Sequence, residues 1–187
     1  MIHNKKMSQS NLISGFENNI VFKIAVVGHH TSGKTSLLQK YTRKSLQKDY
    51  MTTLGAQFSK FTAKVDKNYL KLYFWDITDD DKLRSLRRSF LKDSNAGIIV
   101  FSYYHEESFE LIENLYDNIK EFCGDIPIIL LGNLAPYRGS RRRKEVTDKQ
   151  VLTLTKDRNF TGFFKVDPKD KESFQDIFQF LTISLYN

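Results

Sequence analysis

Residues 20–38 read IVFKIAVVGHHTSGKTSLL, an apolar run that leads directly into a loop bounded by glycines and then into a helical sequence. Gly28, Gly33, Lys34 and Thr35 satisfy the pattern G-x-x-x-x-G-K-[ST], in which backbone N–H groups surround phosphate oxygens at a helix amino terminus. In this pattern the lysine reaches the outer phosphates and the threonine hydroxyl coordinates Mg²⁺. Because the loop lies between a predicted strand and a predicted helix, the sequence predicts a phosphate-binding site.

The remainder of the chain alternates predicted strands with predicted helices, a pattern that indicates an α/β fold. We expect a six-stranded, mostly parallel sheet with helices on both faces, and the run at 19–27 should be covered on both sides. The predicted strands are residues 19–27, 58–65, 69–75, 96–103, 126–131 and 163–166, with a hairpin turn at 66–68. The predicted helices are residues 34–43, a segment through Leu83, Leu86 and Phe90, a segment through Ile112, Leu115, Tyr116 and Ile119, and residues 147–157 and 171–186.

Length and composition indicate one globular domain, residues 19–187, behind a flexible polar arm at residues 1–18. No apolar run approaches the roughly 18 residues of a membrane-spanning helix, and the amino terminus lacks a secretory signal. The lone Cys123 suits a reducing compartment, so a cytoplasmic location is expected. The ending LTISLYN carries no prenylation signal and Ile2 excludes myristoylation, so no lipid anchor is visible and membrane contact would be peripheral.

The net charge of +7 could attract nucleic acid or an anionic membrane. The densest basic run, RGSRRRKE at residues 138–145, contains no interleaved aromatic side chains for base stacking. We therefore interpret this run as a solvated loop and expect no nucleic-acid partner. His29 and His30 are likewise interpreted as solvent-facing neighbours rather than metal ligands, because no further ligand cluster accompanies them.

Several segments together resemble the small GTPases of the Ras superfamily, closest to the Rab and Ras branches. They are GHHTSGKTSLL at 28–38, YMTTLGAQF at 50–58, YFWDITDDD at 73–81, AGIIVFSYYHEESF at 96–109 and LLGN at 130–133. The resemblance covers about residues 20–185 and implies a P-loop NTPase G domain. It also implies GTP and GDP as ligands, Mg²⁺ as cofactor, and effector or regulatory proteins that bind two switch loops, from Lys44 to Thr53 and from Asp79 to Asp93.

The resemblance assigns roles to individual positions of this chain. The implied Mg²⁺ ligands are Thr35, Thr53 and, through a water, Asp76, and the implied catalytic positions are Lys34 and Asp80. The implied nucleotide-binding residues are Gly28, His30, Thr31, Ser32, Gly33, Lys34, Thr35, Ser36, Tyr50, Thr53, Asn133, Leu134, Pro168 and Lys169.

The segment after Asp76 departs from the family pattern. Where the family has Asp-x-x-Gly and then a catalytic Gln, this chain reads DITDD at 76–80. An ionised Asp80 can only accept hydrogen bonds, whereas Gln also donates one to phosphate. If Asp80 points toward the terminal phosphate, the two negative charges about 4 Å apart repel by roughly 4 kcal/mol at an effective dielectric near 20. We therefore expect GTP hydrolysis to be slower than is usual in the family. In the alternative interpretation, residues 79–81 point into water and merely solubilise the loop.

The base-recognition positions depart as well. The family motif Asn-Lys-x-Asp becomes NLAP at 133–136, and Pro136 lacks the carboxylate that accepts two hydrogen bonds from guanine, each worth roughly 1.5–3 kcal/mol. The family's Ser-Ala-Lys becomes DPK at 167–169, and Pro168 has no backbone N–H to donate. Asn133 is still expected to brace the phosphate loop.

Two hypotheses follow from these matches and departures. In the first, the chain is a nucleotide switch, because its phosphate and magnesium positions are retained together. In the second, it is a pseudo-GTPase that binds proteins, with nucleotide absent or unselective, because the base-recognition and catalytic positions are degraded. A nucleoside kinase on another phosphate-loop fold is disfavoured, because it gives no reason for the WD strand end or the TTLG loop. The first hypothesis is favoured, with guanine as the default base by analogy of fold.

Overall fold

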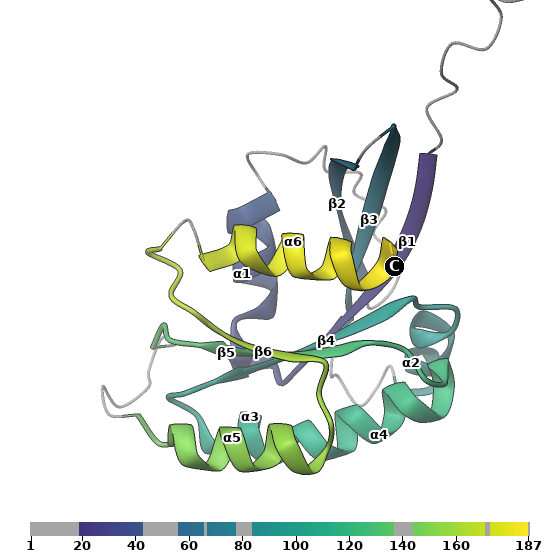
Figure 1. The fold of residues 1–187 in the computed structure, drawn as a ribbon. Helices are drawn as coiled ribbons and strands as arrows, with labels where there is room; N and C mark the ends of the chain where they lie inside the picture. Colours follow the sequence, from purple (N-terminus) through teal and green to yellow (C-terminus); the bar gives the residue numbers. More distant parts are fainter. Residues whose placement is uncertain are drawn as a thin grey trace, which may run out of the picture.

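The structure is a computed structural model that describes residues 19–42, 56–65, 67–77, 84–136, 144–170 and 173–186. Figure 1 shows one twisted sheet with helices on both faces, which confirms the predicted α/β class. The strands are β1 (Asn19–Val27), β2 (Ala56–Val65), β3 (Asn68–Ile77), β4 (Ala96–Ser102), β5 (Ile128–Asn133) and β6 (Gly162–Val166). The helices are α1 (Lys34–Thr42), α2 (Arg84–Leu91), α3 (Glu106–Glu110), α4 (Ile112–Cys123), α5 (Asp148–Asp157) and α6 (Ser173–Tyr186), and η2 (His30–Ser32) is a 3₁₀ turn.

The sheet order places the first strand at its centre. The strands are arranged β2-β3-β1-β4-β5-β6, and only β2 runs antiparallel to its neighbour. Parallel strands direct their carboxyl ends toward the same edge of a sheet, where ligands of open α/β folds bind. Because β1 lies between β3 and β4, the loop that follows β1 lies beside the ends of both strands. The topology therefore gathers the predicted site residues at one edge.

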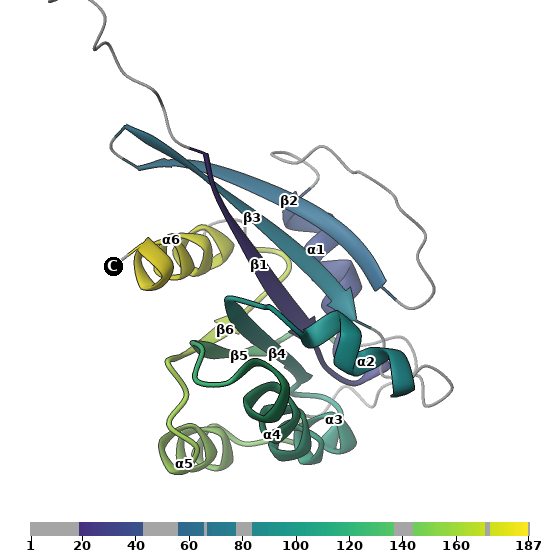
Figure 2. The same ribbon diagram turned by 90° about the vertical axis from the view of Figure 1, so that its right-hand side faces the viewer.

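Two hydrophobic clusters hold the helices to the sheet. Figure 2 shows α1 and α6 on one face and α2, α3, α4 and α5 on the other. On the first face Leu37 packs with Phe74 and Phe178, and on the second face Ile99 packs with Ile119. Strands β4 and β5 are buried along their whole length because both of their faces are covered, as the apolar runs predicted.

The amino-terminal half of β1 is more exposed than its apolar sequence predicted. Residues 24–27 are buried, but Val21 is 56% exposed and Lys23 is half-buried. In Figure 2 the start of β1 and the hairpin of β2 and β3 extend together beyond the helices. The prediction that β1 is covered on both faces is therefore wrong for its first half: Phe22 packs against the first hydrophobic cluster on one face, whereas Asn19 and Val21 on the other face are exposed.

The hairpin of β2 and β3 is longer than predicted. Val65 pairs with Asn68, so Asn68 belongs to β3 rather than to the turn. On one face of the hairpin three residues of β2 meet an aromatic partner on β3: Phe58 meets Trp75 edge-to-face at 4.3 Å between ring centroids, Lys60 lies over Tyr73, and Lys64 lies over Tyr69. Such cross-strand pairs stabilise the register of a sheet.

Two further boundaries differ from the sequence prediction. Strand β5 covers Ile128–Asn133 instead of 126–131, because Pro127 has no N–H to contribute to the strand ladder. Strand β4 ends at Ser102, and the short helix α3 that follows was not predicted. The remaining elements confirm the expected ones within two residues. Across the described residues, no helix has both the length and the apolar character that crossing a bilayer requires.

Candidate nucleotide-binding site

The loop between β1 and α1 depends on its two glycines. Gly33 has φ +81°, in the left-handed region where a side chain is strained. A Cβ atom on Gly28 would lie 2.2 Å from the carbonyl oxygen of Val100 on β4, closer than any real contact. The loop therefore passes tightly over the end of β4 and then turns sharply into α1, so the first N–H groups of α1 lie at the end of the loop.

The side chain of Asn133, the last residue of β5, is hydrogen-bonded to the backbone of this loop. This side chain is buried, and Nδ2 donates a hydrogen bond of 2.9 Å to the carbonyl oxygen of Ser32. Its Oδ1 accepts a hydrogen bond of 2.9 Å from the backbone N–H of Ala135. Both polar ends of the side chain are thus used within the protein, and the expectation that Asn133 braces the phosphate loop is confirmed.

Buried Lys34 and Asp76 and half-buried Thr35 form a polar group at the carboxyl ends of β1 and β3. Asp76 pairs with Val26 in the sheet register, and the hydroxyl of Thr35 donates a hydrogen bond to Asp76 Oδ2. Burial raises the pKa of Asp76, while the hydrogen bond from Thr35 and the charge of Lys34 partly oppose that rise. Among the described residues, Asp76 Oδ1 is buried without a hydrogen-bond partner, and so is the hydroxyl of Ser32.

A divalent cation with oxygen ligands fits this group. A buried carboxylate oxygen without a partner is unfavourable unless a cation or an ordered water compensates it. A threonine hydroxyl and a carboxylate are hard oxygen ligands of the kind that Mg²⁺ prefers. Within the described ranges, no three His, Cys, Asp or Glu side chains converge on one point, so these ranges contain no site rich in imidazole and thiolate.

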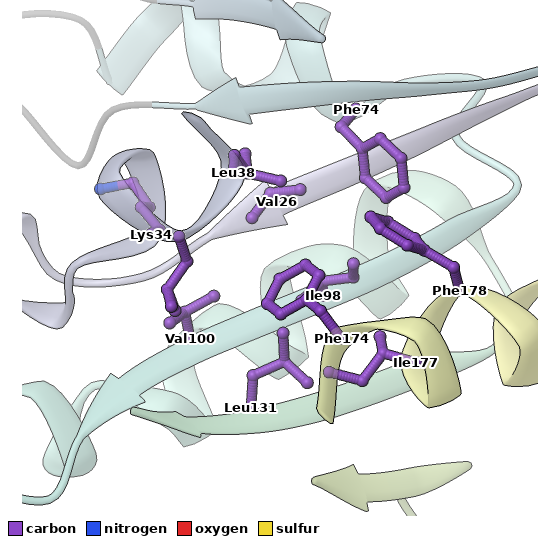
Figure 3. A pocket seen from close by; sticks show the side chains of 11 residues that line it. Val26, Lys34, Leu38, Phe74, Ile98, Val100, Leu131, Phe174, Ile177 and Phe178 are labelled. Atoms are coloured by element: carbon purple, nitrogen blue, oxygen red, sulfur yellow. The ribbon is translucent and has the colours of Figure 1, made fainter. Parts of the chain in front are cut away.

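The aliphatic part of Lys34 borders an apolar cavity inside the domain. Figure 3 shows this cavity between β1, β4, α1 and α6, with Val100, Phe174 and Phe178 in its wall and the amino end of Lys34 pointing away from the two phenylalanines. Its volume is about 10 Å³, room for one water at most. The cavity is therefore a packing gap, and the lysine uses its stem for packing while its charge is directed elsewhere.

The two histidines of the loop differ from each other. His30 is exposed, as predicted, but the prediction that His29 faces solvent is wrong. His29 is half-buried, its Nδ1 lies 2.7 Å from Oγ1 of Thr31, and its ring stacks on that of His105 with 5.0 Å between centroids. Sequence reasoning also missed His105, because nothing local links a residue after β4 to this loop. Of the other loop residues assigned to the nucleotide, Ser32 is buried and Ser36 is exposed on α1.

The predicted base-binding residues lie at the adjoining ends of β5 and β6. Leu134 is partly buried against the second hydrophobic cluster, and its N–H donates to the carbonyl oxygen of Val166 at 2.9 Å. The carbonyl oxygen of Pro168 accepts a hydrogen bond from the ammonium of Lys40 on α1. Lys169 is exposed, and its N–H donates to Asp167 Oδ1 at 2.9 Å. The structure thus brings both base loops to the phosphate-loop edge of the sheet.

Three predicted site residues, Tyr50, Thr53 and Asp80, lie outside the described residues, as does most of the basic run at 138–145. The described ones converge. The phosphate loop, Lys34 and Thr35 meet Asp76 from β3 and Asn133 from β5 at a single edge of the sheet.

A glycine-bounded phosphate loop after the central strand, a lysine and a threonine at the start of the next helix, and a carboxylate at the end of β3 define a P-loop NTPase domain of the G-domain type. The chain belongs to the Ras family, whose sequence model matches residues 23–187. This match confirms the resemblance to Ras-superfamily small GTPases.

Several relatives to which the chain is similar are Rab-type proteins. The chain is similar to Ras-related protein Rab-11B of Dictyostelium discoideum, with 26% identity over 180 residues that cover 94% of this chain and 80% of that protein. It is also similar to Ras-related protein Rab-7L1 of Rattus norvegicus, with 28% identity over 176 residues that cover 89% and 83% of the two chains. A third relative is the Ypt/Rab-type GTPase ypt7 of Schizosaccharomyces pombe, with 25% identity over 164 residues that cover 85% and 79%.

Proposed function

We propose that this chain is a Mg²⁺-dependent molecular switch that binds guanine nucleotides and hydrolyses GTP to GDP and phosphate slowly. The observation that supports this function best is the polar group of Lys34, Thr35 and Asp76 beside the phosphate loop, in which Asp76 Oδ1 is buried and has no hydrogen-bond partner among the described residues. A protein that had lost its nucleotide would gain nothing from keeping a buried carboxylate in this position, since burial disfavours its charged form.

The residues of the site have different roles in holding the nucleotide. The N–H groups of the phosphate loop and the first turn of α1 would bind the phosphates, and the ammonium of Lys34 would neutralise their outer oxygens. Thr35, Asp76 and Thr53 would hold Mg²⁺, which supplies further charge neutralisation when it is bound. Asn133 keeps the loop in its binding shape through its hydrogen bond to Ser32.

Slow hydrolysis follows from the residue at position 80. A carboxylate there can accept a hydrogen bond from the attacking water but cannot donate one to the phosphate, as a glutamine does. The charge of Asp80 would also repel the charge that develops on the transferred phosphoryl group. Lys34 would continue to stabilise that charge, so hydrolysis is reduced rather than abolished.

Guanine selectivity should be weak. Pro136 is exposed and has no acceptor for the base, and Pro168 has no N–H to donate, so the phosphates supply most of the affinity. The terminal phosphate would order the segments 44–53 and 79–93 for effector or regulatory proteins. We further propose a cytoplasmic location, one domain at 19–187 that follows the arm at 1–18, and a peripheral mode of any membrane contact.

The same departures support a second candidate function, that of a pseudo-GTPase that binds proteins without selective nucleotide binding. Identifying the nucleotide that is released when the purified protein is denatured separates the two candidates. A clean GDP or GTP signal supports the switch. An empty protein that also shows no heat of binding with GDP, GTP or ATP at millimolar Mg²⁺ supports the pseudo-GTPase.

A turnover assay tests the catalytic part of the proposal. Single-turnover GTP hydrolysis should be faster in Asp80→Gln than in the wild type, because glutamine restores the donor and removes the charge. Asp80→Asn removes the charge without providing a side chain of glutamine's length, so it should give a smaller increase. If the wild type already hydrolyses GTP as fast as Asp80→Gln does, the assigned role of Asp80 is wrong.

A further inference from the structure

Two imidazole rings contact the same hydroxyl in the phosphate loop. Thr31 Oγ1 lies 2.7 Å from Nδ1 of His29 and 3.0 Å from Nδ1 of His105. The backbone N–H of Thr31 also donates to Nδ1 of His29, at 3.3 Å. His29 precedes Thr31 by two residues, whereas His105 comes from the connection between β4 and α3, 74 residues further along the chain.

The donors and acceptors in this group allow a single arrangement of protons. Because Nδ1 of His29 accepts the N–H of Thr31, it carries a lone pair and no proton. Its short contact with the hydroxyl must then be a hydrogen bond that Thr31 donates. A hydroxyl has one hydrogen, so the remaining contact is a bond that Nδ1–H of His105 donates to Thr31 Oγ1. The chain of bonds runs from His105 through Thr31 to His29, and His29 is neutral with its proton on Nε2.

This chain of bonds holds the part of the loop where phosphate would bind. His29 is the N-cap of the 3₁₀ turn η2, and its imidazole performs the capping. Stacking of His29 on His105 adds a second contact between the loop and the start of α3. The loop is therefore fixed to two other parts of the domain, to β5 through Asn133 and to the β4–α3 connection through His105.

Charged and titratable groups of the described residues lie near both rings. Glu107 Oε2 lies 3.8 Å from Nε2 of His105, and the carboxylate of Glu145 accepts the N–H of Glu106, the residue that follows His105. His29 instead faces the ring of His30 at 4.0 Å and that of His105 at 5.0 Å. A proton on Nε2 of His105 leaves its Nδ1–H in place, whereas a proton on Nδ1 of His29 removes the acceptor for the Thr31 N–H and reverses the bond with the Thr31 hydroxyl.

We propose that His29 and His105 are positioning residues that hold Thr31, and with it the phosphate loop, in the conformation that retains nucleotide. The proposal rests on the nucleotide-binding function proposed above, and it adds that the retention of nucleotide depends on the protonation state of His29. Protonation of His29 at Nδ1 removes the acceptor of the bond from the Thr31 N–H and forces the Thr31 hydroxyl to accept from His29 instead of donating to it, so the loop loosens as the pH falls through the range near 6.5 in which imidazoles ordinarily gain a proton.

A spectroscopic experiment tests the arrangement of protons directly. In the full chain labelled with ¹⁵N-histidine, long-range ¹H–¹⁵N spectra at pH 7.5 should show His29 with an unprotonated Nδ1 and His105 with a protonated Nδ1. The chain has four histidines, so one substitution at each position assigns the signals. A proton on Nδ1 of His29, or the same tautomer mixture at both residues, would overturn the inference whether or not nucleotide binds.

Dissociation of fluorescent GDP tests the consequence for nucleotide. His105→Phe keeps an aromatic ring but removes the donor, and one neutral hydrogen bond corresponds to a dissociation rate that is roughly two- to tenfold faster. His105→Asn offers an N–H donor near the same place and should restore a rate close to that of the wild type. His29→Phe and His29→Asn form the equivalent pair, in which the amide oxygen of asparagine restores the acceptor. If both members of a pair change the rate equally, the hydrogen bonds do not position the loop.

The pH profile separates this role from a merely structural one. Between pH 7.5 and 5.5 the dissociation rate should increase more in the wild type than in the double variant His29→Asn/His105→Asn, which cannot titrate at these positions. Parallel profiles would overturn the inference while leaving nucleotide binding intact. A wild type that binds no GDP would instead overturn the proposed function, and the tautomers would still decide the proton arrangement.

Discussion

Gly33 and Asn133 should be strongly coupled, and a double-mutant cycle with alanine at both positions measures that coupling. A Cβ atom on Gly33 would lie 2.4 Å from Nδ2 and 3.7 Å from Cγ of Asn133. Apart from the two residues next to Gly33 in the chain, no other described residue has a heavy atom within 4 Å of that position. Gly33→Ala therefore displaces the Asn133 side chain and breaks its bond to Ser32. Once Asn133 is truncated to alanine, nothing remains for the new methyl group to displace.

The expected free energies follow from these contacts. Alanine at φ +81° is destabilising by about 1.5 kcal/mol, and breaking the buried hydrogen bond to Ser32 adds about 2 kcal/mol, so Gly33→Ala should lower the free energy of unfolding by about 3.5 kcal/mol. Asn133→Ala loses both side-chain hydrogen bonds, for about 3 kcal/mol. The double variant should lose about 4.5 kcal/mol rather than the additive 6.5 kcal/mol, which leaves a coupling of about 2 kcal/mol.

Urea unfolding of the four proteins provides the measurement. Trp75 is the single tryptophan of the chain and serves as the fluorescent probe. The proteins are stripped of nucleotide in EDTA, so that ligand binding does not add to their stability. Additive losses, with a coupling below about 0.5 kcal/mol, would refute the claim that the Asn133 side chain is what excludes a methyl group at position 33.

Three further predictions concern separate parts of the domain. Burial and the hydrogen bond to Asp148 raise the pKa of Tyr103, so above about pH 10 the unfolded chain releases a proton that the folded chain retains, and stability falls as the pH rises. The melting temperature of Tyr103→Phe should therefore fall less than that of the wild type between pH 9 and 11, and equal slopes would contradict this assignment. Millimolar Mg²⁺ should raise the melting temperature of the GDP-bound wild type but not that of Asp76→Ala, and an equal rise in both would exclude Asp76 as a ligand. Phe178 stacks on Phe61 at 4.5 Å, and Phe178→Ala should lose about 3–5 kcal/mol in chemical denaturation, whereas a loss below 1 kcal/mol would show that α6 does not depend on this contact.

The phosphate-loop side of the site could be predicted from sequence because its information is local. The spacing from Gly28 to Thr35 follows directly from a buried strand and fixes the loop, the lysine and the start of the helix together. The roles of Asp76 and Asn133 came from the family resemblance, and the sheet order then placed both residues at the end of the loop.

The features that sequence reasoning missed depend on contacts between distant segments. The bond between Thr31 and His105 joins residues 74 positions apart, and neither residue belongs to a recognisable pattern with the other. The exposure of Val21 depends on which helices reach the start of β1, and an apolar run carries no information on that point. The later start of β5 reflects Pro127, which belongs to the apolar run but cannot donate to a strand ladder.

The arrangement of lysines along the sheet affects how copies of the protein meet one another. Strands β2 and β6 form the two edges of the described sheet, and an edge strand offers its unpaired backbone groups to any neighbouring chain. Lys60 and Lys64 are carried by the ten-residue strand β2, and Lys165 by the five-residue strand β6. If the β2 strand of a second copy paired in register with this β2, the lysine ammonium groups of the two strands would lie close together and repel each other. Strand β6 has only five residues, so it can pair with only a short segment of another chain. The same lysines that pack on tyrosine rings within the hairpin therefore protect the domain from fibrillar self-association.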